Sequence, residues 1–430
     1  MKQRLFAVFL IVLLVAPISS VIEISNAGEE SNGFLSEQIS INNNIVDMIN
    51  QVNESLVKNY LKGLTEIGPR YTGSENCKKA ANYIFDEFKK IGLDVKIEPW
   101  RYLQYNCQNV VATLNGSDPD SDAVIIISAH YDTVKNTPGA NDDGTGVSAI
   151  LSIANIFSKY LFKHTIKFIA FSGEEIGALG AHAYVKKAYE NNENIIAVLD
   201  IDMIGYTNSS SNKNFLQILF HDRSKWIFDL SNQIIETYSF SNFSVKISPN
   251  FPSCNYHPFF DYGYDGVLFT HDNSIFYPWL HKPEDTIDKI NYSYFTNATK
   301  ILVAILGYIA NIDIAIQVRI VSPLESHFYI SNIPIKLPGF NFYKTGLRGM
   351  TYVIGRPYVK INISSEEEID YVWFCIDGMA EGFSKGYTDS WRLKRGFYPL
   401  RGKHKISVYV FTKSGKVAYD EMDVFVLSIR

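Results

Sequence analysis

The sequence predicts an α/β protein in which a three-layer α/β/α domain precedes a C-terminal β-sandwich of roughly immunoglobulin size. Between residues 45 and 314, apolar strand-like runs alternate with segments of helical periodicity. Several of these runs are apolar throughout, as in strands that helices cover on both faces. After residue 315, short aromatic and β-branched runs are separated by turns, and no helical pattern longer than two turns is evident.

Helix and strand signals define the order of elements in the first domain. A helical pattern begins at Ile45 and continues to Gly68, and Pro69 follows. Ser74 is a suitable N-cap for a second helix, which Gly92 would stop. The predicted strands are NVVATL, AVIIISA, TIKFIAF, IIAVLDID, FLQILF and GVLF. The helices between them include GVSAILSIANIFSKYL and IGALGAHAYVKKAYE, and a last helix lies near residues 294–312.

The N-terminus predicts export from the cytoplasm. Lys2 and Arg4 precede an apolar stretch, and small residues follow it. We predict a signal peptide over residues 1–27 and a polar leader over residues 28–44. An uncleaved signal anchor is the alternative, because the apolar stretch is just long enough to span a bilayer. The body of the protein is therefore expected to be secreted or extracytoplasmic, with membrane or cell-surface attachment in the second case.

Composition narrows the class of protein. The net charge of −5 and the lack of a basic run argue against nucleic-acid binding. Hydrophobic residues make up 46% and charged residues 20% of the chain, which is typical of globular domains. The expected domains are residues 45–314 and 315–430. The four cysteines form no CxxC pair, so a thiolate metal site is not expected, whereas disulfides and free thiols both stay open. These cysteines are Cys77, Cys107, Cys254 and Cys375.

Polar residues gather in four segments, three of which come directly after an apolar strand. Ligands of open α/β sheets collect at the carboxyl ends of the strands. Each segment alone is a weak signal, because acidic residues at strand ends are common, but the four together point to one site. The segments hold His130, Asp132 and Asp142; Glu174 and Glu175; Asp200 and Asp202; and His281.

These residue types suit two zinc ions. Zinc takes imidazole and carboxylate ligands, and catalytic sites keep a position for water. Two ions about 3.5–4 Å apart, joined by a carboxylate, can clamp the attacking and leaving oxygens. Glu174 and Glu175 are adjacent and point in different directions, so one can hold a metal while the other faces the water as a base. The alternative for this pair is an acidic first helical turn, which the helix dipole favours.

With these motifs the chain resembles the secreted di-zinc aminopeptidases, co-catalytic zinc metallopeptidases related to glutamate carboxypeptidases, glutaminyl cyclases and transferrin-receptor ectodomains. The resemblance runs from about residue 45 to residue 312 and implies a mixed central sheet in a zinc-peptidase domain. The motifs are GPRYTG at Gly68, NVVA at Asn109, HYD at His130, GANDDGTG at Gly139, GEEIG at Gly173, DMIG at Asp202 and HKPEDT at His281.

The resemblance implies two zinc ions per chain and a set of ligands. His130 and Asp202 would bind one ion, Glu175 and His281 the other, and Asp142 would bridge them. The implied reaction is the hydrolysis of N-terminal residues from peptides with a free N-terminus, by a di-zinc-bound hydroxide.

The resemblance also implies roles for two further acids. Glu174 would be the general base and acid, and Asp132 would orient His130 through its second ring nitrogen. Other polar residues near these motifs are expected to be structural or to support the ligands. They are Asp143, Asp200, His182, His257 and His271.

Two positions depart from the family pattern. Many relatives carry Ser-Asp-His-x-x-Phe where this chain reads CNYHPF, over residues 254–259, which leaves the specificity of the substrate pocket open. Leu280 stands where some relatives have a tyrosine that helps to stabilise the oxyanion. The metal ligands are not affected by either change.

Other activities remain as alternatives. A glutaminyl cyclase-like aminoacyltransferase generally works with one zinc, a carboxypeptidase for acidic dipeptides would need basic pocket residues, and a non-catalytic binding ectodomain would have lost ligands. In the C-terminal domain, Tyr371 and Trp373 share one face of a strand and Phe374 takes the other. We expect one of these two faces to fill the sandwich core, and we favour a core role over a binding role for the aromatic residues of this domain, which include Phe383 and Tyr387. The oligomeric state, the metal loaded in the cell and the preferred substrate side chain stay open.

Overall fold

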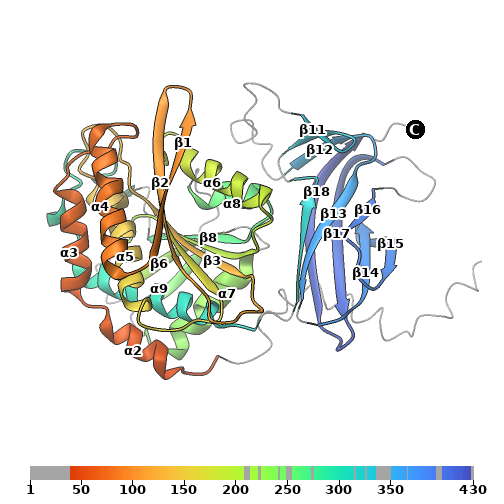
Figure 1. The fold of residues 1–430 in the computed structure, drawn as a ribbon, viewed down its shortest axis with the longest axis horizontal. Coiled ribbons are helices and arrows are strands. Elements are labelled where there is room, and N and C mark those ends of the chain that lie inside the picture. Colours follow the sequence, from red (N-terminus) through yellow and green to blue (C-terminus); the bar gives the residue numbers. More distant parts are fainter. Residues whose placement is uncertain are drawn as a thin grey trace, which may run out of the picture.

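The computed structural model consists of an α/β domain and a β-sandwich domain that lie side by side (Figure 1). It describes residues 39–207, 214–220, 224–240, 243–247, 254–272, 276–313, 316–324, 327–335, 350–365, 367–393 and 400–427. The predicted signal and most of the predicted leader lie outside these residues. Within the described segments, no helix combines the length and the apolar character needed to cross a membrane.

The α/β domain is built on a mixed sheet with the strand order β1-β2-β4-β3-β5-β8-β6-β7. The four central strands, β4-β3-β5-β8, are parallel to one another. On either side of them the pairing is antiparallel, between β2 and β4 and between β6 and β8. The strands are β1 (Asp94–Tyr102), β2 (Tyr105–Leu114), β3 (Val124–His130), β4 (Thr165–Phe171), β5 (Ile195–Ile201), β6 (Asn214–Phe220), β7 (Phe243–Ile247) and β8 (Gly266–His271). The prediction of a mixed sheet is confirmed.

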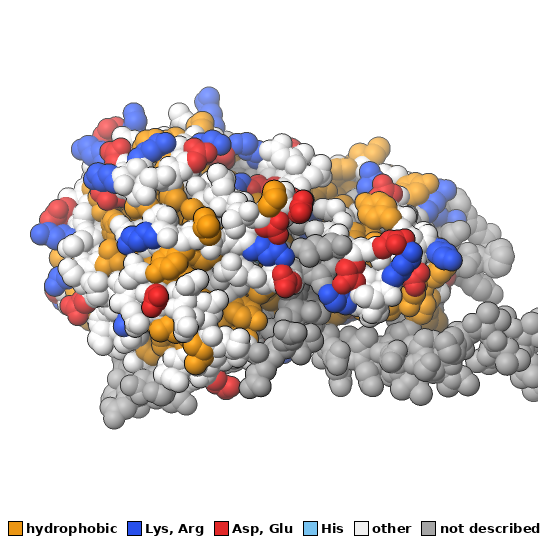
Figure 2. Space-filling view, turned by 60° about the horizontal axis from the view of Figure 1, so that its bottom comes forward, with side chains coloured by type: hydrophobic (Ala, Val, Ile, Leu, Met, Phe, Trp, Pro, Cys, Tyr) orange, Lys and Arg blue, Asp and Glu red, His pale blue; other side chains and the backbone are white. Residues whose placement is uncertain are grey.

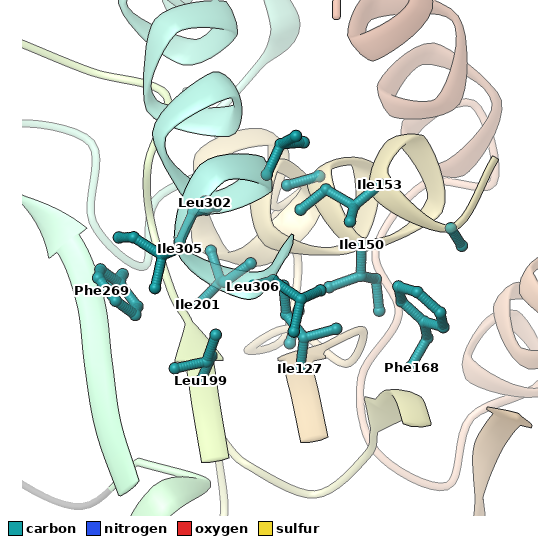
Figure 3. Packing of buried hydrophobic residues seen from close by; sticks show 14 of the residues in the cluster. Ile127, Ile150, Ile153, Phe168, Leu199, Ile201, Phe269, Leu302, Ile305 and Leu306 are labelled. Carbon is teal, nitrogen blue, oxygen red and sulfur yellow. The ribbon is translucent and has the colours of Figure 1, made fainter. Parts of the chain in front are cut away.

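Helices cover both faces of this sheet, as predicted. One face packs against α4 (Glu75–Ile91), α5 (Thr145–Phe157), α7 (Lys225–Thr237) and α9 (Tyr292–Ile309), and α2 (Asn43–Gln51) and α3 (Glu54–Thr65) pack on these helices. The other face packs against α6 (Leu179–Glu190) and α8 (Tyr256–Asp261). Successive residues of β3 point to opposite faces of the sheet. Ile127 packs near Ile150 and Leu306 (Figure 3), whereas Ile126 belongs to the apolar cluster on the side of α6.

The first predicted helix is divided in two. The periodicity predicts one helix over residues 45–68, but the chain forms α2 and α3 with a break at Val52. Asn53 caps α3, because its side-chain oxygen accepts a hydrogen bond from the Leu56 amide at 3.0 Å. The predicted ends of the next helix are confirmed, since Ser74 Oγ accepts a hydrogen bond from the Cys77 amide and Gly92 ends α4 with φ of 94°.

The second domain is a β-sandwich, and its described residues contain no helix. The smaller sheet has the order β16-β13-β9, and in the larger sheet, β11-β10-β12-β18-β17-β14-β15, the pairs β10–β12 and β12–β18 are parallel. Both sheets contribute to one apolar cluster. The strands are β9 (Ile316–Ser322), β10 (Phe328–Ile330), β11 (Ile333–Ile335), β12 (Met350–Ile354), β13 (Tyr358–Ser365), β14 (Ile369–Ile376), β15 (Met379–Lys385), β16 (Ser390–Arg392), β17 (Arg401–Thr412) and β18 (Val417–Leu427).

One face of β14 fills the core of the sandwich, as expected, and it is the face that carries Phe374. Phe374 is buried in the cluster between the sheets. Tyr371 and Trp373 lie on the opposite face of β14, where Tyr371 stacks on Phe411 with ring centroids 4.3 Å apart. Phe383 is 65% exposed on the neighbouring strand. Tyr371, Trp373 and Phe383 therefore do not serve the core, and the alternation along the strand alone does not say which face is covered.

The sandwich packs on the layer that contains α6 and α8. The Tyr189 hydroxyl of α6 donates a hydrogen bond to the Val321 carbonyl at 2.5 Å. The guanidinium of Arg319 lies 4.1 Å from the ring centroid of Tyr264. The face shown in Figure 2 carries interspersed positive and negative side chains over the α/β domain. Aromatic side chains of the α/β domain, those of Tyr189 and Tyr264, thus take part in the contact between the domains.

Candidate metal centre

The structure brings the five predicted ligands together at one edge of the central sheet. His130 is the last residue of β3, Asp202 follows β5 and Glu175 lies in the turn after β4. These strands are parallel neighbours, so their carboxyl ends meet. Asp142 lies in the turn Ala140–Gly144 that leads into α5, and His281 lies in the segment before α9.

The first group of candidate ligands is His130, Asp142 and Asp202, and all three residues are buried. His130 Nε2 lies 3.2 Å from Asp142 Oδ1 and 3.6 Å from Asp202 Oδ1. Donor atoms of one tetrahedral zinc ion, each bound at about 2.0–2.1 Å, are about 3.4 Å apart. These separations therefore match the edges of a zinc coordination shell.

The second group is Asp142, Glu175 and His281, so Asp142 belongs to both groups. His281 Nε2 lies 3.3 Å from Asp142 Oδ2 and 3.2 Å from Glu175 Oε2. The two oxygens of Asp142 thus face different histidines, His130 through Oδ1 and His281 through Oδ2. This is the arrangement that a bridging carboxylate requires.

Unpaired buried atoms in the first group favour a cation. His130 Nε2 and Asp202 Oδ1 are buried and have no hydrogen-bond partner within the described part of the chain. Nε2 is close to Asp142 but makes no hydrogen bond with it. Buried polar atoms without a partner are rare, and here they converge on one another with the donor set that zinc prefers. The residues present therefore fit the expected metal.

Asp132 lies against the second ring nitrogen of His130, and its backbone carbonyl is the nearer partner. The Nδ1 atom of His130 lies 3.1 Å from the backbone carbonyl oxygen of Asp132 and 3.6 Å from its carboxylate. A carbonyl can only accept, so Nδ1 carries a proton and Nε2 is the nitrogen left to bind metal. The Asp132 carboxylate instead accepts hydrogen bonds from the Thr72 hydroxyl at 2.6 Å and the Glu174 amide at 3.2 Å.

Glu174 is placed beside the first group without belonging to either group. Its Oε2 atom lies 3.9 Å from His130 Nε2, and its side chain is 12% exposed. Both Glu174 and Glu175 precede α6 by several residues, so they do not form the first helical turn that was the alternative for this pair. Burial raises the pKa of Glu174 well above its ordinary value. Such a carboxylate can take up a proton near neutral pH.

In the second group of ligands, the pKa values of His281 and Glu175 are raised, so these residues bind protons when no metal is present. Hydrogen bonds to Asp142 and Glu175 raise the pKa of His281 to about 10. Burial raises the pKa of Glu175 to about 7. The metal-free site therefore holds positive charge as protons on His281, and a metal ion would replace them.

Asp285 and Arg70 are functional neighbours that the sequence reasoning did not single out. The Asp285 carboxylate accepts hydrogen bonds from the Asn141 amide at 3.0 Å, the Asp142 amide at 3.1 Å and the Tyr277 hydroxyl at 2.8 Å. It therefore holds the backbone of the residue that both groups share. Its place in the HKPEDT motif was the signal that could have identified it.

Arg70 holds the loop after β3 in place through hydrogen bonds to its backbone carbonyl groups. Its guanidinium donates hydrogen bonds to the carbonyl oxygens of Tyr131 at 2.7 Å, Pro138 at 2.6 Å and Gly139 at 2.9 Å. Burial lowers the pKa of Arg70 to about 10, which still leaves it charged at neutral pH. Gly139 opens the turn with φ of 63°, and a Cβ there would lie 2.6 Å from the Asp142 carbonyl oxygen.

The remaining predicted neighbours lie outside both ligand groups. Asp143 accepts hydrogen bonds from the amides of Gly146 and Met203, and Asp200 accepts one from the Ser128 hydroxyl. His271 Nδ1 lies 3.0 Å from the Asp272 carbonyl oxygen, His257 Nδ1 accepts from the Cys254 amide, and His182 is on α6. The CNYHPF segment adjoins the site, because Cys254 Sγ lies 3.9 Å from Asp202 Oδ2.

Known sequences that are similar to this chain are those of peptidases. A family model described as Peptidase family M28 matches residues 109–306. Aminopeptidase YwaD of Bacillus subtilis is 25% identical over 259 residues, which are 58% of this chain and 55% of that enzyme. A probable zinc metalloprotease of Phaeosphaeria nodorum is 27% identical over 264 residues, which are 48% of this chain and 53% of that protein. The chain thus spans about half the length of these two relatives.

Solved structures share the fold of the α/β domain. The LapA aminopeptidase of Legionella pneumophila has a TM-score of 0.57 at 21% identity, covering 64% of this chain and 77% of that one. A glutaminyl cyclase of Fimbriiglobus ruber has a TM-score of 0.51 at 15% identity, covering 60% and 95%. The motifs, the fold and the sequence comparisons agree, and the resemblance is confirmed: residues 109–306 of the α/β domain match the model of Peptidase family M28.

Proposed function

We propose that this chain is a zinc-dependent aminopeptidase that holds two zinc ions and releases N-terminal residues from peptides. The observation that carries the proposal is the pair of ligand groups that share Asp142, with Glu174 beside them. His130 and Asp202 would hold one ion, Glu175 and His281 the other, and Asp142 both. The relative named Aminopeptidase YwaD supports this substrate class. In keeping with the predicted signal, we place the activity outside the cytoplasm.

Zinc would polarise the scissile carbonyl and lower the pKa of the attacking water. Glu174 would accept the proton of that water, since its carboxylate is nearly buried beside the ligands and its pKa is raised by burial. The same carboxyl group would then donate the proton to the departing amine. The Glu174 amide is held by the Asp132 carboxylate, which fixes the position of the base relative to His130.

The test is hydrolysis of a panel of aminoacyl p-nitroanilides, each with a free and with an N-acetylated amino group. The zinc-loaded wild type is compared with Glu174→Gln, and the metal content of both is measured. We expect turnover of the free substrates only, and a loss of at least about 100-fold in Glu174→Gln with zinc still bound. No turnover by a fully metallated wild type would refute the proposal and favour the cyclase or binding alternatives.

A matched control uses the neighbouring acid. Glu175→Gln removes a proposed ligand rather than the base, so it should lower zinc content as well as activity. If Glu174→Gln lost zinc and Glu175→Gln did not, the two proposed roles would be exchanged.

A further inference from the structure

Two cysteines from separate elements meet close to the residues that adjoin the candidate metal centre. Cys77 lies in the first turn of α4 and is fully buried, and Cys107 lies on β2 and is half-buried. Their Sγ atoms are 3.3 Å apart. A disulfide has about 2.05 Å between its sulfurs, so the bond requires these two atoms to come about 1.2 Å closer.

The pair adjoins the segment that holds the metal centre. Residues 70–74 run directly into α4, and they include Arg70, which binds the loop carbonyls, and Thr72, which binds the Asp132 carboxylate. On the other side, Cys107 Sγ lies 3.9 Å from the hydroxyl of Tyr131, the residue after His130. A link between the two sulfurs would thus join this segment to the central sheet next to the site.

We propose that Cys77 and Cys107 form a disulfide bond that links the segment of residues 70–74 to strand β2 near the metal centre. Cys107 is the more accessible of the two, and a hydrogen bond from Cys77 lowers its pKa to about 6, which favours it as the attacking thiolate. The other two cysteines lie in different domains, since Cys254 adjoins Asp202 and Cys375 is on β14 of the sandwich.

The bond requires an oxidant, which we specify as a compound with its own disulfide. The Cys107 thiolate attacks one sulfur of that disulfide, forming a mixed disulfide and releasing one thiolate. The Cys77 thiolate then attacks the sulfur of Cys107, which forms the internal bond and releases the second thiolate. The two protein thiols are oxidised, their two protons go to solvent or to the released thiolates, and the oxidant is reduced to two thiols.

The first experiment measures the bond itself. The full chain is purified without reductant, equilibrated with oxidised glutathione, and alkylated under denaturing conditions. We expect two alkylated cysteines, Cys254 and Cys375, and one cross-linked peptide pair that contains Cys77 and Cys107. Alkylation of Cys77 and Cys107, glutathione adducts on them, or a link to any other cysteine would overturn the proposal. This result does not depend on peptidase activity, so it is separable from the proposed function.

The second experiment measures what the bond does. The cross-link closes a loop from residue 77 to residue 107, so the oxidised protein should melt roughly 10 °C above the reduced protein. Zinc loss to a chelator should also be slower in the oxidised form, and both differences should vanish in Cys107→Ala. The control is Cys375→Ala, which should retain both differences. Equal melting and equal zinc loss in the oxidised and reduced wild type would refute the fastening role.

Discussion

Replacement of Asp285 by asparagine tests whether the backbone of the shared ligand is held in place by this carboxylate. The Asp285 side chain is buried and accepts three hydrogen bonds, two of them from the amides of Asn141 and Asp142. In Asp285→Asn one of the two side-chain positions becomes an NH₂ group, which cannot accept. At least one backbone amide then loses its partner in a buried place, and the remaining bonds lose the help of a charged acceptor.

The expected loss follows from these contacts. A buried donor left without a partner costs about 1–3 kcal/mol, and weakening the other charge-assisted bonds adds about 1 kcal/mol, so the free energy of unfolding should fall by about 2–4 kcal/mol. Because the affected backbone carries Asp142, zinc affinity should fall by about 10- to 100-fold. Urea unfolding at fixed zinc and competition with a chromogenic chelator measure the two effects.

The matched control is Asp288→Asn, since Asp288 is exposed, lies three residues further along the same segment and contacts only Lys289 and Thr286 through its carboxylate among the described residues. This variant should leave both the stability and the zinc affinity unchanged. If Asp285→Asn behaved like Asp288→Asn, with normal unfolding energy and normal zinc affinity, the inference that Asp285 holds the Asp142 backbone would be wrong.

Three further predictions follow from the same structure. Arg70→Lys should lower the free energy of unfolding by about 3 kcal/mol in denaturant melts, because one ammonium group cannot reach all three carbonyls that the guanidinium binds, and an unchanged midpoint would contradict the reasoning. Burial lowers the pKa of His182 to about 4, below its ordinary 6.5, so its contribution to stability is complete above pH 6.5 and is lost as the pH falls towards 4. His182→Gln should reduce this loss by up to about 2 kcal/mol in unfolding curves at pH 7 and pH 4.5, and parallel pH dependences of the two proteins would refute the assignment. Zinc binding at pH 7 should release about one to two protons from the second group of ligands, because His281 with a pKa of about 10 and Glu175 with a pKa of about 7 must give theirs up, and calorimetry in buffers of different ionisation enthalpy measures the released protons. The His281→Ala variant should release fewer protons when it binds zinc. If the wild type released no protons, the metal would not bind at His281.

The strands and the ligand positions were predictable because both rest on local signals. Continuous apolar runs indicated β3, β4 and β5, and parallel strands that end together bring His130, Glu175 and Asp202 to the same edge. The edge strand β1 was not identified, because charged residues interrupt its apolar pattern and much of it is exposed. Short β7 carried too few residues for a periodic signal.

The supporting contacts of the site were not predictable, since their partners are backbone atoms far away in the sequence. Arg70 binds carbonyls that lie 61 to 69 positions further along the chain, and Asp285 binds amides that precede it by more than 140 positions. A side-chain motif does not reveal such partners. The role of Asp132 illustrates the same limit, because its carbonyl rather than its carboxylate is the nearer partner of His130.

The two ligand groups differ in their access to water. All members of the group with His130 are buried, whereas the His281 side chain in the other group is 51% exposed. An ion held only by buried side chains must wait for a local opening of the fold before it can leave, but an ion at His281 can exchange directly with solution. Zinc would therefore enter and leave the two groups one after the other. A long-lived form of the protein would hold zinc only in the buried group with His130. In a preparation that has lost part of its zinc, the measured activity would then depend on how much zinc remains in the group with His281.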